Sequence, residues 1–108
     1  MADIKVITDQ DELDKLFEAS HNEPVFIFKH SSTCGISLHV FEQVSAINGT
    51  INVVVVQDSR PLSDNIAERT GQRHQSPQAF VIRDGGVDYH ATHYAIDANA
   101  IQQKLAVK

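Results

Sequence analysis

The segment at residues 51–56 constrains the fold of this chain more than any other, because it reads Ile-Asn-Val-Val-Val-Val. This β-branched and largely apolar run is typical of a strand that is covered on both faces. Strands of that kind occupy the middle of α/β sheets, where helices pack against the two faces. We therefore expect an α/β fold with a mixed sheet and helices on both of its sides.

Apolar patterns and turn signals predict the remaining elements. Further strands are expected at residues 4–7, 25–29, 79–82 and 87–94, the last two joined by the tight turn Arg83-Asp84-Gly85-Gly86. Helices are expected at about residues 9–20 after the N-cap Thr8, from Gly35 to the stop signals Asn48-Gly49, from Asp58-Ser59 and Pro61 to about Thr70-Gly71, and after the N-cap Asp97. The resulting order, β-α-β-α-β-α-β-β-α, is that of the thioredoxin fold.

Length and charge limit the classes of protein that this chain can represent. Its 108 residues suit one domain, residues 1–108. A formal net charge of -5 disfavours nucleic acid and anionic membranes as partners. No apolar run approaches the roughly 20 residues of a spanning helix, and the first residues, Met-Ala-Asp-Ile, lack the pattern of a signal peptide. We therefore expect a cytoplasmic protein.

The single cysteine, Cys34, follows a buried strand and opens a helix. Free amide groups and the positive end of the helix dipole at such a position stabilise a thiolate, and Lys29 and His30 are expected to add positive charge. Ser37 stands where a dithiol oxidoreductase has its second cysteine, so any disulfide exchange must be monothiol and needs an external thiol. The alternative reading of Cys34 is a small buried apolar residue.

Three blocks of sequence resemble the monothiol bacilliredoxin family of bacillithiol-using bacteria. They are Phe-Lys-His-Ser-Ser-Thr-Cys-Gly-Ile-Ser at residues 28–37, Arg-His-Gln-Ser-Pro-Gln at residues 73–78 and His-Ala-Thr-His-Tyr-Ala-Ile at residues 90–96. The resemblance implies a thioredoxin-like fold, Cys34 as nucleophile and Pro77 as the cis proline that faces it. Without the resemblance a trans Ser76-Pro77 bond would be expected, because most X-Pro bonds in folded proteins are trans. The resemblance implies no bound cofactor, bacillithiol as co-substrate, and S-thiolated proteins as clients. The residues expected to contact substrate are Thr33, Gly35, Ser37, Ser76, Pro77 and His93.

One departure from the family leaves two other readings open. The family usually has proline after the cysteine, and this chain has Gly35. Cys-Gly-Ile-Ser thereby resembles the Cys-Gly-Phe-Ser motif of monothiol glutaredoxins, which bind glutathione and an iron-sulfur cluster. Two features count against that reading. Those glutaredoxins have Thr-Val before the proline, where this chain has Gln75-Ser76, and their glutathione-binding glycine pair has no counterpart if Gly85-Gly86 is a hairpin turn, as it reads. A non-catalytic thioredoxin-like binding module is the third reading.

Six histidines invite a metal site, but they lack a short pair spacing on one helical face, so none is expected. His30 and His74 are expected in loops near Cys34, either as proton donor or thiolate partner or as plain loop residues without a chemical role. His39 lies about 140° around the helix from Cys34 and should face solvent. His90 and His93 would face opposite sides of a regular strand.

Overall fold

The computed structural model describes residues 1–107 and contains one mixed sheet. The strands are β1 (Asp3–Val6), β2 (Val25–His30), β3 (Thr50–Val55), β4 (Gln78–Arg83) and β5 (Gly86–Thr92). The helices are α1 (Gln10–Ala19), α2 (Gly35–Val44), α3 (Arg60–Thr70) and α4 (Ala98–Ala106), and the 3-10 helix η1 (His93–Ala95) follows β5. The order of strands and α-helices is the one predicted from the sequence. The predicted domain of residues 1–108 includes Lys108, which lies outside the described residues.

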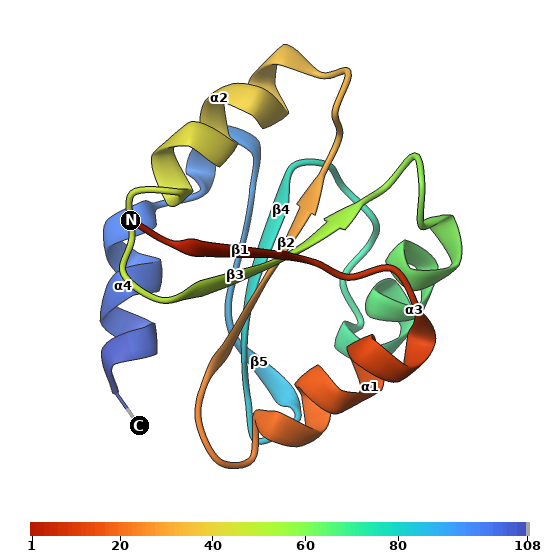
Figure 1. Ribbon diagram of the computed structural model, residues 1–108, viewed down its shortest axis with the longest axis vertical. Helices are drawn as coiled ribbons and strands as arrows, with labels where there is room; N and C mark the ends of the chain where they lie inside the picture. Colours follow the sequence, from red (N-terminus) through yellow and green to blue (C-terminus); the bar gives the residue numbers. More distant parts are fainter. Residues whose placement is uncertain (108) are drawn as a thin grey trace.

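The strands follow the spatial order β1-β3-β2-β4-β5 (Figure 1). β1, β3 and β2 are parallel, whereas β4 pairs antiparallel with both β2 and β5. Parallel neighbours require crossover connections, and α1 and α2 provide them. Because β2 and β3 are adjacent and parallel, their carboxyl ends meet at one edge of the sheet. The segments that follow these two strands therefore lie close together.

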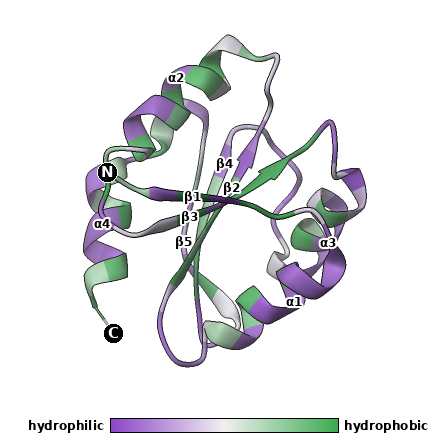
Figure 2. Cartoon of the chain, in the orientation of Figure 1, coloured by the Kyte–Doolittle hydropathy of each residue, from purple (hydrophilic) through white to green (hydrophobic). Residues whose placement is uncertain are grey.

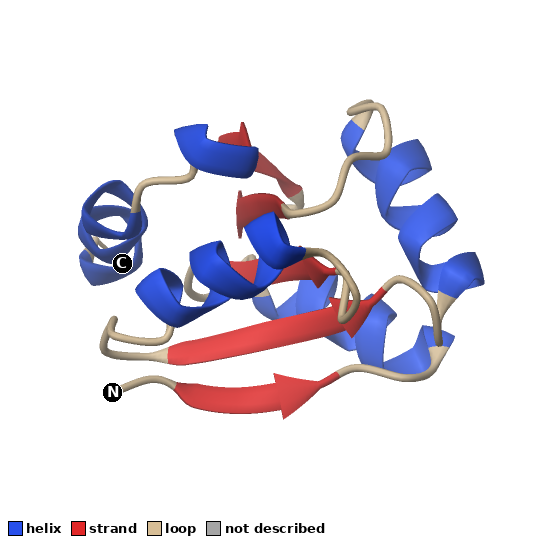
Figure 3. Ribbon diagram, turned by 90° about the horizontal axis from the view of Figure 1, so that it is seen from above, coloured by secondary structure: helices blue, strands red, loops and turns tan. Residues whose placement is uncertain are grey.

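Helices cover both faces of the sheet, as predicted (Figure 3). On one face, Leu13 and Phe17 of α1 and Leu62 and Ile66 of α3 pack in one cluster with strand residues such as Ile27. On the other face, α2 and α4 share a second cluster with the sheet. Figure 2 shows hydrophilic and hydrophobic residues mixed along the helices, as expected for helices that bury one face.

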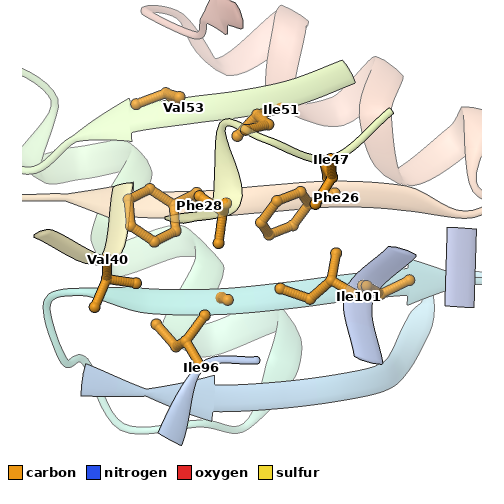
Figure 4. Packing of buried hydrophobic residues seen from close by; sticks show 11 residues of the cluster. Phe26, Phe28, Val40, Ile47, Ile51, Val53, Ile96 and Ile101 are labelled. Carbon is orange, nitrogen blue, oxygen red and sulfur yellow. The ribbon is translucent and has the colours of Figure 1, made fainter. Parts of the chain in front are cut away.

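The second cluster lies next to the segment that carries Cys34. Phe26 and Phe28 lie on the same side of β2, as alternation along a strand requires. In Figure 4 these rings lie between Ile51 and Val53 of β3 on one side and Val40, Ile96 and Ile101 on the other. The labelled members are Phe26, Phe28, Val40, Ile47, Ile51, Val53, Ile96 and Ile101. Val40 anchors α2 in this cluster, so the start of α2 is fixed against β2.

The tight turn between β4 and β5 has the predicted geometry. Asp84 and Gly85 have φ values of 53° and 76°, and Arg83 pairs with Gly86. Two successive positive φ values define the type I′ turn, which matches the twist of an antiparallel hairpin. The Gly85-Gly86 pair is therefore part of a hairpin, as the sequence indicates.

Two helix boundaries differ from the sequence prediction. α2 ends at Val44 and not near Asn48, because the Ile47 N–H donates to the Val44 carbonyl at 3.2 Å in a tighter turn. That turn still buries Ile47, so its apolar spacing reflects burial and not helix. The N-cap of α1 is Asp9 and not Thr8, since an Asp9 carboxylate oxygen accepts the Glu12 N–H at 2.9 Å.

The last strand is shorter than predicted. β5 ends at Thr92, because His93 has a φ of 52° that interrupts extended backbone, and η1 begins there. His93 is consequently not on a strand, and the expectation that it faces opposite to His90 on one strand is wrong. None of the helices within residues 1–107 combines the length and the apolar composition needed to cross a bilayer.

Candidate active site

Cys34 occupies the N-cap position of α2, directly after the loop that leaves β2. Its backbone is extended, with φ -103° and ψ 121°, and no side chain caps the helix. An N-cap side chain ordinarily accepts hydrogen bonds from the amides of the first turn. Cys34 makes no such hydrogen bond here, and its thiol lies at the end of α2 where the helix dipole is positive. The thiol is free and partly exposed.

Ser37 lies beneath Cys34 and has no exposed surface. Its hydroxyl oxygen accepts the Ser31 N–H at 3.0 Å and lies 2.7 Å from Nδ1 of His30. Ser37 thus connects the end of β2, the loop of residues 31–33 and the first turn of α2. Burial gives it this role in place of the direct substrate contact expected from the sequence.

His30 is the last residue of β2 and not a loop residue, which corrects the sequence prediction. Its ring stacks on Phe41 with centroids 4.9 Å apart and is almost fully buried. Burial lowers the pKa of His30 below its ordinary value, so the neutral ring is favoured. A neutral Nδ1 can accept the Ser37 hydroxyl proton, and His30 then contributes hydrogen bonding and not positive charge.

Lys29 lies on the other face of the sheet, because neighbouring strand residues alternate. It is completely buried, and its Nζ donates to the Ser63 carbonyl at 3.2 Å. Desolvation lowers the pKa of Lys29 to about 8, partly offset by the nearby charge of Asp64. The Lys29 ammonium therefore faces α3, whereas Cys34 lies at the start of α2. Lys29 does not contact the thiol directly, as an expected source of positive charge beside it would.

Gln57 is a residue of this site that the sequence did not reveal. It follows β3 and reaches the loop of residues 31–33, where its amide bonds to Ser31, Ser32 and Thr33. The available signal was its place after the β-branched strand, since residues beyond the carboxyl ends of adjacent parallel strands gather at one edge of the sheet. A lone glutamine without a motif gave no chemical reason to select it.

The Ser76-Pro77 bond is cis, as the family resemblance implies. Most X-Pro bonds in folded proteins are trans, so the sequence without the resemblance predicts the other isomer. Pro77 is buried, and its carbonyl accepts the His93 N–H at 3.0 Å. The Ser76 Oγ is buried and has no hydrogen-bond partner within the described part of the chain. Ser76, Pro77 and His93 therefore form one unit at the start of β4.

Gln78 holds the segment before the cis proline. Its Oε1 accepts the Gln75 N–H at 3.3 Å, and its Nε2 donates to the Arg73 carbonyl at 3.0 Å. The same Nε2 lies 2.8 Å from Nε2 of His90, which must therefore accept and carry its proton on Nδ1. Burial, followed by the charge of Lys29, lowers the pKa of His90, which agrees with a neutral ring.

His74 and His39 contact residues other than Cys34. His74 is in the predicted loop, but its Nδ1 lies 3.1 Å from the Ser63 Oγ, on the α3 side. Partial desolvation, then the charges of Lys29 and Arg60, lower the pKa of His74 against the opposing effect of Asp64. His39 is exposed, as predicted, and its ring lies edge-on to that of Tyr94, with the two ring centroids 6.3 Å apart.

The structure arranges the predicted site residues in two groups. Thr33, Cys34, Gly35 and Ser37 form the first, at the junction of β2 and α2, whereas Ser76, Pro77 and His93 form the second. η1, which begins at His93, packs against α2 and so connects the two groups. Within residues 1–107 no group of three or more histidine, cysteine or acidic side chains is arranged to hold a metal ion.

Comparisons with known proteins identify the family and the fold. A family model described as "Monothiol bacilliredoxin BrxC" matches residues 5–101. A solved structure described as a proposed oxidoreductase with a thioredoxin fold is 31% identical, with a TM-score of 0.82, and the match covers 94% of this chain and 92% of the other.

Two thioredoxins share the fold at lower identity. A mutant thioredoxin from Halobacterium salinarum NRC-1 is 17% identical, with a TM-score of 0.70 and coverage of 95% and 88%. The Fasciola hepatica thioredoxin is 13% identical, with a TM-score of 0.70 and coverage of 94% and 96%. The chain thus has a thioredoxin fold, and its family and its oxidoreductase relative support a thiol redox function. It belongs to the monothiol bacilliredoxin family.

Proposed function

We propose that the protein is a monothiol disulfide oxidoreductase that removes a small thiol, bacillithiol, from mixed disulfides on client proteins. One observation carries the proposal. The single sulfur nucleophile of the chain stands at the uncapped N-cap of α2. The thiol at this position is free and partly exposed, and disulfide exchange requires an accessible thiol.

The proposed reaction has two exchange steps. In the first, the Cys34 thiolate attacks the bacillithiol sulfur of the mixed disulfide, a disulfide forms between Cys34 and bacillithiol, and the client leaves as a thiolate that takes a proton from water. In the second, another small thiolate attacks the bacillithiol sulfur of this adduct. Cys34 is released as a thiolate, and the two small thiols leave as a disulfide. Cys34 is thereby reduced, and the small thiols are oxidised by two electrons.

Ser37 supports the monothiol form of this reaction. Its buried hydroxyl occupies the position of a resolving cysteine and is engaged by Ser31 and His30. The adduct on Cys34 thus has no thiol within the chain to displace it. Because the cycle requires a reduced Cys34, we propose a reducing compartment, the cytoplasm, as its setting.

Two exposed apolar side chains, one on α2 and one beside it, favour a protein client. Leu38 lies one helical turn after Cys34, on the same stripe of α2, and Tyr94 lies beside α2 through its contact with His39. They are 47% and 70% exposed. Apolar surface next to a reactive thiol suits a protein that must be docked before exchange. The Ser76 backbone before the cis proline would pair with an extended client segment.

A de-thiolation assay tests this function. One model protein is prepared as a mixed disulfide with bacillithiol and, separately, with glutathione, and its mass is followed after addition of the reduced chain. We expect loss of bacillithiol from the client with a matching gain on Cys34, and no transfer by the Cys34→Ser variant. Preference for the glutathione client, with a coloured dimer after iron-sulfur reconstitution, would favour the glutaredoxin alternative. Client binding without any transfer would favour a binding module.

A further inference from the structure

Gln57 makes three hydrogen bonds to three consecutive residues of the loop that precedes Cys34. Its Nε2 donates to Ser31 Oγ at 2.8 Å and to Thr33 Oγ1 at 3.0 Å. Its Oε1 accepts the Ser32 backbone N–H at 3.3 Å. Both hydrogens of the amide and one oxygen lone pair are therefore used by a loop that is distant in sequence.

The orientation of the Gln57 amide follows from these partners. A backbone N–H can only donate, so the atom facing Ser32 must be the carbonyl oxygen, and the NH2 group must face the two hydroxyls. A glutamine side chain that is exposed ordinarily keeps several rotamers, and fixing it costs entropy. Three simultaneous hydrogen bonds are sufficient reason for the side chain to adopt one conformation.

Ser31 is held from two sides. Its N–H is bound from below by the buried Ser37 hydroxyl, and its Oγ is bound from outside by Gln57. The Ser31 carbonyl in turn accepts the Cys34 N–H at 3.3 Å. The backbone that sets the extended conformation of Cys34 is thus restrained through both partners.

We infer that Gln57 is a positioning residue for Cys34, and this inference rests on the proposed function. By fixing residues 31–33 against the end of β3, it keeps Cys34 at the N-cap of α2, where an incoming disulfide can reach the partly exposed sulfur. Without Gln57 the loop keeps the hydrogen bond between Ser31 and Ser37 and that of its own turn, from the Cys34 N–H to the Ser31 carbonyl, but loses the three bonds to the end of β3. The sulfur then occupies the reactive position for a smaller fraction of the time.

Substitutions at Gln57 have a matched control at Gln102. Gln102 is another glutamine whose amide holds a loop, accepting the Asn48 N–H at 2.6 Å and donating to the Asn48 carbonyl at 3.0 Å. Asn48 precedes β3, so that loop lies at the opposite end of the strand from Gln57. Gln102→Leu removes the same kind of contact far from Cys34. Gln57→Glu keeps the acceptor for the Ser32 N–H and can accept hydrogen bonds from the Ser31 and Thr33 hydroxyls.

The test combines two rates with one local probe. Adduct formation on Cys34 is measured with a small symmetrical disulfide, alkylation of Cys34 is measured with iodoacetamide, and hydrogen exchange is followed at the Ser32 amide. For Gln57→Leu we expect both rates to fall by about 10-fold to 100-fold, as for a misplaced reacting group, and Ser32 exchange to accelerate. Gln102→Leu should leave all three unchanged, and Gln57→Glu should restore the Ser32 protection.

The outcomes separate the inference from the proposed function. Unchanged rates in Gln57→Leu overturn the positioning role, as does an equal loss of rate in Gln102→Leu. A wild-type protein that resists the disulfide but is alkylated faster than Gln57→Leu would contradict the proposed function and support the positioning role. If Gln57→Leu failed to fold, Gln57→Ala would provide the same comparison.

Discussion

The Ser37 hydroxyl and the His30 imidazole lie 2.7 Å apart beneath the loop that carries Cys34. Ser37 is completely buried, and its oxygen also receives the Ser31 N–H. With a neutral His30, the two hydrogen bonds of Ser37 are complementary: the Ser31 amide donates to the hydroxyl, and the hydroxyl donates to Nδ1. The position that carries a second thiol in dithiol enzymes therefore serves here to hold the nucleophile's loop.

Ser37→Ala should destabilise the protein more than an ordinary serine substitution. It leaves the Ser31 N–H and His30 Nδ1 without their partner, and an unpaired buried polar group costs about 1–3 kcal/mol. Ser45→Ala is the matched control, because its Oγ only donates to the Phe41 carbonyl, which also accepts the Ser45 N–H. Urea unfolding measures both variants, and equal losses of unfolding free energy would contradict the role assigned to Ser37.

The free energy of unfolding should decrease at acid pH, because His30 is buried in its neutral form. Burial lowers the folded-state pKa of this group below the ordinary value of 6.5, so the unfolded chain takes up the proton first as the pH decreases. The contribution of neutral His30 to stability is therefore fully present above pH 6.5, and it is lost as the pH falls through the lower pKa of the folded state. His30→Asn, which keeps a hydrogen-bond acceptor but does not titrate, should show a smaller acid slope in urea unfolding. Parallel slopes for the two proteins would contradict this account.

Gly35→Pro should stabilise the chain by about 0.4–1 kcal/mol, because it restricts the unfolded state without removing a needed contact. Gly35 is the first residue of α2, where proline is favoured, and a Cβ there meets nothing within 4 Å. The extended backbone of Cys34 is also compatible with a following proline. Gly71→Ala is the contrasting control, since φ of 71° strains any side chain. A lower melting temperature for Gly35→Pro would show that the first turn differs from this description.

Lys29→Met should change how stability depends on alkaline pH. The pKa of Lys29 falls from 10.5 to about 8 on folding, so the unfolded chain binds the additional proton between these values. Wild-type stability should therefore rise with pH across this window, by a total on the order of 3 kcal/mol.

The methionine variant lacks this rise, because it has no ammonium to deprotonate. At neutral pH it should be as stable as the wild type or more so, since it replaces a buried charge with an apolar chain of similar length. Urea unfolding of both proteins at neutral and alkaline pH measures the difference, which isolates Lys29 because all other groups are shared. A difference that does not vary with pH would contradict a buried ammonium at this position.

Much of the fold could be predicted because apolar spacing and turn chemistry act locally. The β-branched strand at β3 and the Asp84-Gly85 turn are examples in which the residues themselves require the observed backbone. Boundaries failed where tertiary packing decided. Ile47 has helical spacing but is buried by a turn, and β5 ends early because His93 adopts a positive φ.

The sequence predicted a site residue only where the residue type itself has a characteristic chemical reactivity. Cys34 is recognisable because a lone thiol before a helix has a defined reactivity. Gln57 and the partners of Ser37 were not, since their roles depend on which strands lie side by side and on which face each residue points to. The order β3-β2-β4 brings these residues together, and no local pattern in the sequence specifies that order.

The central claim is that Cys34 exchanges with small-molecule disulfides and prefers bacillithiol. The most direct test exposes the reduced protein and its Cys34→Ser variant briefly to bacillithiol disulfide and, separately, to glutathione disulfide at neutral pH, and then records the intact mass. We expect the wild type to gain one bacillithiol rapidly, to react far more slowly with glutathione disulfide, and the serine variant to gain neither. A wild-type mass that stays unchanged with both reagents would contradict the account.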